Sequence, residues 1–367
     1  MKKIKVLHTE WSDGWGGQEI RIIGEMIALR EKGVELFLAC REEAQIKVKA
    51  EEAGFQVFAL PFKGNTDLRT LWGLIKIIRK EKIDIVNTHS GKDTWVGGLA
   101  AKIVGAKFIR TRHLSNPIRK SRLNFINELA DYIFTTGESV RQDMIDNNRI
   151  DPNKIISIPT GIDETVYDPE KYDRFKCRER FGMEEDELAI GIVAVLRQFK
   201  RHDLFLEMAK ILVAKYPGRK LKFYIAGEGP QRNNIEKVIE EYGLEKHVVL
   251  LGHLSNVPEF LAALDIFVLT SDSKEGVPQS VMQALMMKKN VIATNAGSTA
   301  DLWHDENFML IPAGDDMRSL TDAVSILIDD KNKRDLYAKK ARKYIVDTYS
   351  RKVMQETIYE IYQEMVL

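Results

Sequence analysis

The chain has 367 residues, and single hydrophobic cores rarely grow beyond about 250–300 residues, so we expect two domains. Charged residues make up 30% of the chain while the formal net charge is only +1, which argues against nonspecific nucleic-acid binding. The two cysteines, Cys40 and Cys177, indicate neither a disulfide framework nor a cysteine-rich metal site. The charged N-terminus lacks a signal-peptide core, and no run approaches the roughly 18–20 apolar residues of a spanning helix. We therefore expect a cytoplasmic protein that is soluble or at most peripheral to the membrane.

The N-terminal half alternates short apolar runs with longer amphipathic ones. Apolar residues at helical spacing predict helices over 18–32, 68–80 and 94–104. Runs typical of strands lie at 4–7, 36–39, 57–60, 83–86, 108–110 and 132–135. This alternation predicts a parallel sheet wrapped by helices.

A glycine-rich turn follows the first predicted strand and runs into a helix. Gly14, Gly16 and Gly17 make this turn flexible, but Glu19 occupies the place of the third glycine of a dinucleotide-binding fingerprint. We therefore do not expect a nicotinamide cofactor. Gly16 and Gly17 either approach another ligand or form a tight turn without one.

Two histidines, His89 and His113, each close a predicted strand. Ligands gather at the carboxyl ends of parallel strands, so both rings could face one cleft. The alternative is that each ring makes a structural hydrogen bond. Neither a serine or cysteine nucleophile motif nor a His-Glu-x-x-His metal pattern accompanies them.

Two charged segments follow. Residues 116–130 begin with a basic cluster of Arg119, Lys120 and Arg122 and then become amphipathic. This segment is either a solvated helix face or a contact for anionic lipid or a phosphorylated acceptor. Residues 164–187 lack a clean period, so we interpret them as a linker with a lead-in helix.

The second half begins with an apolar strand at 188–195, and a helix is predicted over 204–215. Arg197 and Lys200 lie in the loop between them. Arginine forks onto phosphate oxygens and lysine supplies a point charge, so the pair suits a diphosphate leaving group. The alternative is a basic surface loop, and Arg201 is a reserve candidate.

Residues 223–230 predict a strand, a glycine turn and a helix start. Gly227 and Gly229 in that turn would permit close approach of a planar or phosphate group. A further strand is predicted at 290–294, and a terminal amphipathic helix follows Ser350 as its N-cap.

The stretch 271–283 predicts a polar loop that enters a helix. Pro278 suits the first turn of that helix. Glu275 lies in the loop beside Gly276, and Gln283 lies in the helix. A carboxylate accepts hydrogen bonds from hydroxyls, an amide both donates and accepts, and a helix N-terminus favours phosphate. A nucleotide sugar carries all of these groups.

Several motifs, in this order, resemble those of the retaining glycosyltransferases of family 4, which have the GT-B fold. They are Gly16-Gly17-Gln18-Glu19, Thr111-Arg112-His113, Ala226-Gly227-Glu228-Gly229-Pro230 and Glu275-Gly276-Val277-Pro278 with Gln283 eight positions after Glu275. The resemblance implies catalytic roles for His113 at the reaction centre, for Arg197 and Lys200 on the donor diphosphate and for Glu275 on the donor sugar. It implies donor contacts for Gly16, Gly17, Gly227, Gly229, Gly276, Val277 and Gln283.

The sequence departs from the family pattern at several positions. Gln283 stands where the family has a glutamate, although an amide still bonds a ribose diol. Val195 stands where an arginine is common, and Arg197, two residues on, is expected to reach the phosphates instead. Thr160 replaces the asparagine of the family's Asn-Gly-Val-Asp segment.

We therefore expect an α/β protein with the GT-B fold, in which two Rossmann-like domains with parallel sheets face an interdomain cleft. Residues 1–165 would form the acceptor-side domain, 166–348 the nucleotide-sugar domain, and 349–367 a helix that returns to the first domain. No Asp-x-Asp motif indicates a metal site, and no cofactor is expected besides a donor such as a UDP- or GDP-sugar.

The resemblance implies a metal-independent retaining hexosyltransferase. It would move the sugar to a glycan or lipid-linked acceptor in cell-envelope polysaccharide or lipopolysaccharide synthesis, with no nucleic-acid partner. Two alternatives stay open. One is a nucleotide-sugar 2-epimerase on the same fold, which would need several carboxylates near the sugar. The other is a non-catalytic nucleotide-sugar binder.

Overall fold

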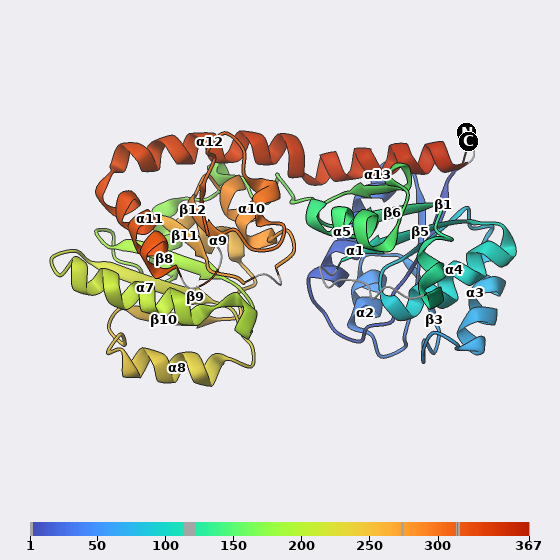
Figure 1. Cartoon of the computed structure of the whole chain (residues 1–367), viewed down its shortest axis with the longest axis horizontal. Helices are drawn as coiled ribbons and strands as arrows, with labels where there is room; N and C mark the ends of the chain where they lie inside the picture. Colours follow the sequence, from blue (N-terminus) through green and yellow to red (C-terminus); the bar gives the residue numbers. More distant parts are fainter. Residues whose placement is uncertain (1–2, 114–121, 273–274, 313, 315, 367) are drawn as a thin grey trace. The chain divides into compact units, whose positions relative to one another are not determined.

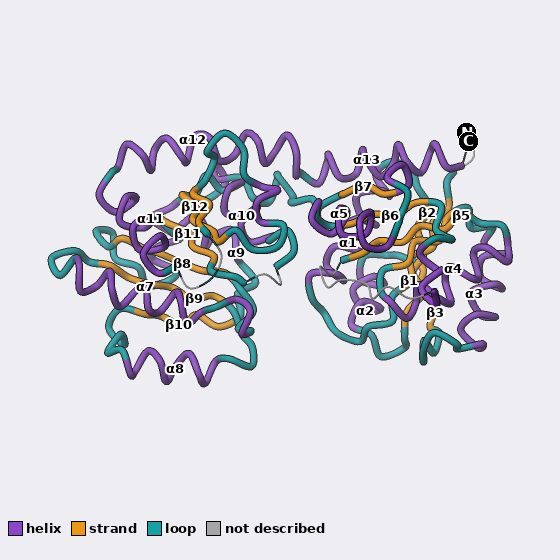
Figure 2. The backbone as a smooth tube through the Cα atoms, in the orientation of Figure 1, coloured by secondary structure: helices purple, strands orange, loops and turns teal. Residues whose placement is uncertain are grey.

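The computed structural model describes residues 3–113, 122–272, 275–312, 314 and 316–366 (Figure 1). By its contacts the chain divides into two compact units. Unit 1 comprises Met1–Gly161 together with Arg351–Leu367, and unit 2 comprises Ile162–Ser350. In each unit the strands lie between helices (Figure 2). The C-terminal segment thus belongs to the same unit as the N-terminus.

In the described part of the chain, unit 1 is built on a seven-stranded parallel sheet with the order β3-β2-β1-β4-β5-β6-β7. Its strands are β1 (Lys5–Thr9), β2 (Glu35–Cys40), β3 (Gln56–Ala59), β4 (Ile85–Thr88), β5 (Lys107–Arg112), β6 (Tyr132–Thr135) and β7 (Ile155–Ser157). Nearly all residues of β1, β2 and β4 are buried, as in parallel strands that helices cover on both faces.

The helices of unit 1 are α1 (Gly17–Glu31), α2 (Gln45–Glu52), α3 (Leu68–Glu81), α4 (Gly91–Val104), α5 (Glu138–Asn148) and α13 (Arg351–Val366), with the short 3-10 helices η1 (Arg122–Asn127) and η2 (Pro152–Lys154). Asp67 caps α3 by accepting hydrogen bonds from the amides of Arg69 and Thr70. The last helix, α13, packs on α1, where the side-chain amide of Gln355 donates to the carbonyl oxygen of Ala28.

Unit 2 is built on a six-stranded parallel sheet with the order β10-β9-β8-β11-β12-β13, again among the described residues. Its strands are β8 (Leu188–Val193), β9 (Leu221–Ala226), β10 (Val248–Gly252), β11 (Ile266–Leu269), β12 (Asn290–Thr294) and β13 (Met309–Ile311). Its helices are α6 (Arg174–Arg180), α7 (His202–Lys215), α8 (Arg232–Glu241), α9 (Val257–Ala263), α10 (Gln279–Met286), α11 (Met317–Asp329) and α12 (Lys331–Tyr349), with η3 (Pro169–Lys171), η4 (Gln198–Lys200) and η5 (Thr299–Leu302).

The predicted fold class, two α/β units each with a parallel sheet, is confirmed. Some boundaries differ from the sequence prediction. The strand expected over 188–195 ends at Val193, and its last two positions belong to the following loop. The helix after Glu275 begins at Gln279, so Pro278 is its N-cap residue and does not lie within the first turn. Helices α2, α5 and α9 and strands β7 and β13 were not predicted, since their segments are short or lack a clear period.

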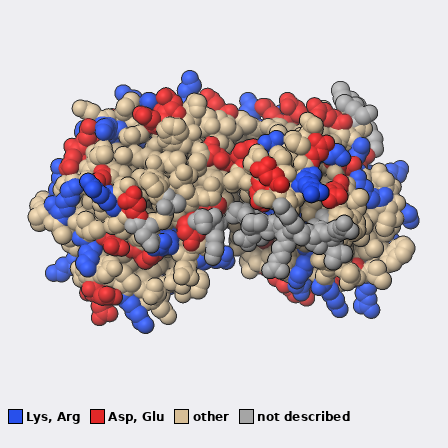
Figure 3. All heavy atoms as spheres, in the orientation of Figure 1, with Lys and Arg blue, Asp and Glu red and all other residues tan. Residues whose placement is uncertain are grey.

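The chain enters unit 2 at Ile162 and leaves it after Ser350. These two points are joined, because the amide of Ile162 donates to the carbonyl oxygen of Tyr349 at 2.9 Å and Ile162 forms an isolated β-bridge with Ser350. On the face drawn in Figure 3, basic and acidic side chains are interspersed, in keeping with the net charge of +1.

Candidate functional site

The loop between β8 and α7 carries Arg197 and Lys200, the predicted diphosphate-binding residues. The neighbouring strand β11 holds this loop through Thr270, which directly follows it. The hydroxyl of Thr270 donates to the carbonyl oxygens of Lys200 (3.0 Å) and Arg201 (2.9 Å). The loop is therefore fixed at the carboxyl ends of β8 and β11, the edge at which parallel α/β sheets bind ligands.

Lys200 forms an ion pair with Glu275, the acid predicted to orient the donor sugar. The lysine ammonium donates to carboxylate Oε2, and the two side chains are only 13% and 9% exposed. In a pair this buried, each charge compensates the other. The structure thus brings together a predicted phosphate-binding cation and the predicted sugar-binding acid from distant parts of the sequence.

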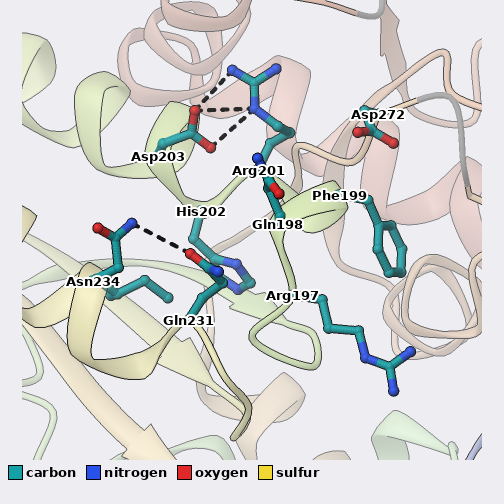
Figure 4. Close-up of a pocket in the computed structure, with 10 residues that line it drawn as sticks. Arg197, Gln198, Phe199, Arg201, His202, Asp203, Gln231, Asn234 and Asp272 are labelled. Carbon is teal, nitrogen blue, oxygen red and sulfur yellow. Dashed lines mark hydrogen bonds and ion pairs between the residues drawn. The ribbon is translucent and has the colours of Figure 1, made fainter.

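Arg197 has an exposed side chain that lines a cavity of about 510 Å³ (Figure 4). The amide side chains of Gln231 and Asn234 line the same cavity. Arg201 is held by Asp203, with 2.8 Å between Nη2 and Oδ2, whereas the guanidinium of Arg197 points away from that pair. A polar cavity with a cation at its wall suits phosphate and hydroxyl groups.

His202 also lines this cavity, and the sequence analysis missed it. Its ring is buried, and neither ring nitrogen has a hydrogen-bond partner among the described residues. Burial, together with the charge of nearby Lys200, lowers the pKa of His202 to about 4. The ring is therefore uncharged at neutral pH. The one sequence signal that could have pointed to His202 was its position next to Arg201 at a helix start.

Gly227 and Gly229 lie in the turn after β9, with φ values of 151° and 157°. A Cβ atom on Gly227 would lie 1.9 Å from the carbonyl oxygen of Ala194, and one on Gly229 would lie 2.7 Å from that of Leu196. These glycines therefore allow the turn to pack directly on the backbone of the loop that carries Arg197. Their contact with a bound donor stays a prediction.

The turn before α10 holds Gly276 and Val277, and Gln283 lies in the second turn of that helix; all three are half-buried. A Cβ atom on Gly276 would meet nothing within 4 Å, so the space that a ligand would need is open.

Gly297 is different. Its φ is 55°, and an added Cβ would lie 1.6 Å from the carbonyl oxygen of Glu275. Gly297 therefore sets the backbone position of Glu275.

In unit 1, Gly16 is the N-cap residue of α1 and Gly17 is its first residue. The amide of Gly16 donates to the carboxylate of Glu19 at 2.8 Å. This capping bond accounts for an acid at the position where a dinucleotide fingerprint needs glycine.

His113 directly follows β5 and is the half-buried end of a chain of three histidines, of which His8 and His89 are buried. Its Nε2 lies 3.0 Å from Nδ1 of His89, which follows β4, and Nε2 of His89 lies 2.8 Å from Nδ1 of His8 in β1. The rings of His8 and His89 are stacked, with 5.1 Å between centroids. The structure thus joins both predicted histidines and adds His8, which no motif marked.

The three histidines are uncharged at neutral pH. Burial lowers the pKa of His8 to about 3 and holds those of His89 and His113 well below their usual range. The guanidinium of Arg21 on α1 acts in the same direction on His89 and His113. Arg21 is itself buried and pairs with Glu25, with 3.8 Å between Nε and Oε2.

The predicted site residues fall into two groups. Gly16, Gly17 and His113 belong to unit 1, and the others belong to unit 2. The basic positions Arg119 and Lys120 lie outside the described residues, and Arg122 begins η1.

Two further features were sought within the part of the chain that the structure describes. No group of three or more His, Cys, Asp or Glu side chains is placed to hold a metal ion there. Across the same residues, every helix is too short or too polar to span a bilayer.

Residues 150–344 match the family Glycosyl transferases group 1, and residues 15–166 match Glycosyltransferase Family 4. Among curated proteins, the chain is 25% identical to the UDP-Gal:alpha-D-GlcNAc-diphosphoundecaprenol alpha-1,3-galactosyltransferase of Escherichia coli, over 100% of this chain and 98% of that protein. It is 23% identical to the capsular polysaccharide biosynthesis glycosyltransferase CapM of Staphylococcus aureus, over 92% of each.

Two solved structures are similar over almost the whole chain. A glycosyltransferase from Rickettsia africae has a TM-score of 0.91 at 20% identity and covers 100% of this chain and 99% of its own. HepE from Anabaena, in complex with UDP-glucose, has a TM-score of 0.81 at 19% identity and covers 98% and 100%. These likenesses confirm the fold expected from the sequence.

Proposed function

The chain belongs to the glycosyltransferases of group 1 and family 4, with the GT-B fold, and we propose that it is a retaining enzyme that uses a nucleotide-sugar donor. The proposed acceptor is a glycan or a lipid-linked sugar of the cell envelope. The buried contact between Lys200 and Glu275 is the observation that carries this proposal, because it joins a cation for the diphosphate to an acid for the sugar.

Unit 2 would bind the donor. Lys200 and Arg197 would neutralise the diphosphate and stabilise the charge that grows on it as the glycosidic bond breaks. Glu275 would accept hydrogen bonds from sugar hydroxyls, with Gly276 leaving room for the ring. Gln283 would bond the ribose. In the free protein Glu275 compensates the charge of Lys200, and a bound diphosphate would take over that role.

Unit 1 would bind the acceptor, near the turn at Gly16 and Gly17. His113 would line the reaction centre as an uncharged ring, because its pKa lies well below the usual range. In the retaining mechanism the acceptor hydroxyl attacks on the face from which the leaving group departs, and the departing phosphate takes its proton. The chain then needs no nucleophilic side chain of its own.

The relatives support the choice of substrates. The name of the E. coli relative gives UDP-galactose as donor and a lipid-linked sugar diphosphate as acceptor. The Anabaena neighbour was crystallised with UDP-glucose, and the S. aureus relative serves capsular polysaccharide synthesis. We extend these chemistries to this chain, together with a cytoplasmic location and peripheral contact with the membrane.

A thermal-shift panel of UDP-, GDP- and ADP-sugars tests the donor. A true donor at about 100 times its Kd stabilises the folded protein by about 2.7 kcal/mol. An unchanged melting temperature with every nucleotide sugar would rule out the proposed donor class. Conversion of the donor sugar without any acceptor would instead support the epimerase alternative.

Transfer assays test the chemistry. With an α-linked donor, the product linkage seen by NMR should also be α, and a β product contradicts retention.

Lys200→Ala and Glu275→Ala should each abolish transfer, whereas unchanged transfer would refute their catalytic assignment. Transfer in the presence of EDTA should equal transfer without it, because Arg197 and Lys200 supply the positive charge.

A further inference from the structure

Two buried carboxyl groups lie close together at the carboxyl ends of the strands in unit 1. Glu10 directly follows β1, Asp93 lies in the first turn of α4, and neither side chain is exposed. Thr9, which precedes Glu10, donates its hydroxyl hydrogen bond to Asp93 at 2.6 Å. Among the described residues no cation forms an ion pair with either carboxyl group. Burial of such groups is costly, so hydrogen bonds have to replace the lost water.

Glu10 holds both ends of the glycine turn, residues 11–17. Its Oε1 accepts hydrogen bonds from the backbone amides of Trp11 and Ser12, at 2.8 Å each, where the turn begins. Its Oε2 accepts a hydrogen bond from the side-chain amide of Gln18, where the turn has entered α1. One carboxyl group therefore ties the start of the turn to its end.

Asp93 holds the neighbouring turn in the same way. Its Oδ2 accepts from the backbone amide of His89 at 2.8 Å, and its Oδ1 accepts from the amide of Ser90 at 2.8 Å and from the hydroxyl of that serine. The ring of His89 is in turn bonded to the ring of His113 at 3.0 Å. Asp93 therefore fixes the backbone that carries the middle ring of the histidine chain.

Neither carboxyl group is left to bind a ligand. Each oxygen of Asp93 accepts two hydrogen bonds, which fills its acceptor sites, and Glu10 is completely buried. Burial, together with the charge of Asp93, raises the pKa of Glu10 to about 8, so Glu10 is largely uncharged at neutral pH. Both groups can influence chemistry only through the turns that they hold.

We propose that Glu10 and Asp93 are positioning residues for the candidate site residues of unit 1. Glu10 sets the shape of the glycine turn, and Asp93 sets the place of His89 and, through it, of His113. The inference rests on the proposed function, which gives the glycine turn and His113 their roles. It adds two residues that act through other residues and do not touch a substrate.

Two substitutions of Glu10 separate hydrogen bonding from the filling of space. Glutamine offers an oxygen to the same two backbone amides, and its own amide can pair with that of Gln18, so E10Q should keep the turn. Methionine has a similar length but is only a weak acceptor. In hydrogen exchange followed by mass spectrometry, peptides covering residues 11–17 should exchange about tenfold faster in E10M than in the wild type and in E10Q. Wild-type exchange in E10M, or equally fast exchange in E10Q, overturns the role of Glu10.

Asp93→Asn tests the second residue. Asparagine accepts hydrogen bonds on one oxygen only, so the amide of either His89 or Ser90 loses its partner. The ring-nitrogen NMR signals of His113 should then shift, and signals that coincide with those of the wild type overturn the role of Asp93. Thr9→Val removes a single bond to Asp93 and should shift the same signals by less, which keeps the test decisive if D93N does not fold.

A transfer assay connects both residues to the proposed function. The probes are UDP-galactose and N-acetylglucosamine diphosphoundecaprenol, the donor and acceptor in the name of the E. coli relative. E10M should lower kcat/KM for the acceptor at least tenfold and leave UDP affinity, which the proposed function assigns to unit 2, unchanged. E10Q should transfer as the wild type does. Equal loss of UDP binding and of transfer in E10M would indicate general damage and would count against a positioning role.

Asp67→Ala is the matched control in unit 1. It removes the cap of α3, which accepts hydrogen bonds from the amides of Arg69 and Thr70, away from the glycine turn. Exchange of residues 11–17, the signals of His113 and transfer should all stay at wild-type values in D67A. A wild type that neither binds UDP nor transfers galactose counts against the proposed function, whereas the exchange and NMR results still decide on Glu10 and Asp93.

Discussion

His8 and His89 determine which nitrogen of His113 carries the proton. Each ring is uncharged and so has one N–H, and the three rings are joined by two hydrogen bonds. Nε2 of His8 is buried without a partner among the described residues. An unpaired N–H is rarer in protein interiors than an unpaired acceptor, so we assign the N–H of His8 to Nδ1. It then donates to His89, His89 donates to His113, and His113 keeps its own N–H on Nδ1.

The buried His8 should make the protein sensitive to acid. Its pKa of about 3 in the folded state lies below the ordinary histidine value of 6.5, so the stability gained from the neutral ring is complete above pH 6.5 and is lost as pH falls towards 3. At pH 4.5, two pH units below 6.5, that loss amounts to about 3 kcal/mol. His8→Asn removes it, so the free energy of unfolding should drop less between pH 8 and 4.5 than in the wild type.

Urea titrations at both pH values measure this difference. Glu10 and Glu25 are also buried, and burial raises their pKa values to about 8 and about 7, so their contributions have the opposite sign. Both glutamates are present in the wild type and in the variant. The difference between the two pH dependences therefore reports on His8 together with the ring of His89 that is bonded to it, and equal dependences would contradict the burial of His8 as a neutral ring.

Substitutions in the Lys200–Glu275 pair can separate its structural role from its chemical role. Glu275→Gln leaves the buried ammonium of Lys200 without compensation and should destabilise unit 2 by about 3–5 kcal/mol, as should Lys200→Met for the carboxylate. The double variant should be less destabilised than the sum of the two. Additive losses in urea titrations would mean that the contact contributes nothing.

UDP binding distinguishes the two single variants further. Glu275→Gln should retain UDP, because the diphosphate supplies the negative charge that Lys200 then lacks. Lys200→Met should lose at least tenfold in UDP affinity. Calorimetry on both proteins gives the comparison, and UDP affinity that survives the loss of Lys200 would remove it from the donor site.

The elements of the candidate donor site are positioned by contacts between backbones. The turn after β12 packs on the carbonyl oxygen of Glu275 through Gly297, and the turn after β9 packs on the β8–α7 loop through Gly227 and Gly229. In each place only a residue without Cβ fits. The site therefore depends on two close backbone contacts, each between a glycine turn and a neighbouring loop, in addition to the side chains that would touch a ligand.

Gly297→Ala tests this dependence. The substitution forces an L residue to a φ of 55° and drives its Cβ into the Glu275 carbonyl. We expect a loss of about 1–3 kcal/mol from backbone strain and a further loss from displacing Glu275, with weaker UDP-sugar binding. Gly276→Ala is the matched control for stability, since its Cβ meets nothing within 4 Å. Thermal unfolding should place Gly276→Ala near the wild type, and a Gly297→Ala protein of equal stability would refute the packing argument.

The sequence was sufficient to predict the alternation of strands and helices. It was not sufficient to predict the contacts between separate segments that position the site. Periodicity predicts a strand or helix because burial of one face is a local property. His8 shows the limit of such patterns: it lies inside a buried strand and its hydrogen-bond partner, His89, follows another strand, so no sequence spacing marks it. Gly297 follows the strand predicted at 290–294, but the need for a glycine there comes from the close approach of Glu275, a contact between separate segments. His202, similarly, had no motif of its own.

At the scale of the whole molecule, the C-terminus completes unit 1. Helix α13 follows α12 directly, but its apolar side chains enter the core that also contains Ile22 and Met26 of α1. The phenol oxygen of Tyr362 lies 3.5 Å from the side chains of Glu25 and Asn87 in the same buried region. Unit 1 is therefore discontinuous in sequence, and its stability depends on the last residues of the chain.

Ending the chain after Ser350 tests that dependence. The truncation removes four buried apolar side chains of α13 from unit 1, those of Met354, Ile358, Ile361 and Tyr362. Each contributes about 1.5–3 kcal/mol by burial, which together reaches the range of a typical domain stability, about 5–15 kcal/mol. We expect unit 1 to unfold while unit 2, which keeps its own core, stays folded. In hydrogen exchange followed by mass spectrometry, peptides of β1, β4 and β5 should lose protection and those of β8 and β11 should keep it. UDP binding by the truncated chain serves as the check on unit 2, and full protection of β1 would show that unit 1 folds without α13.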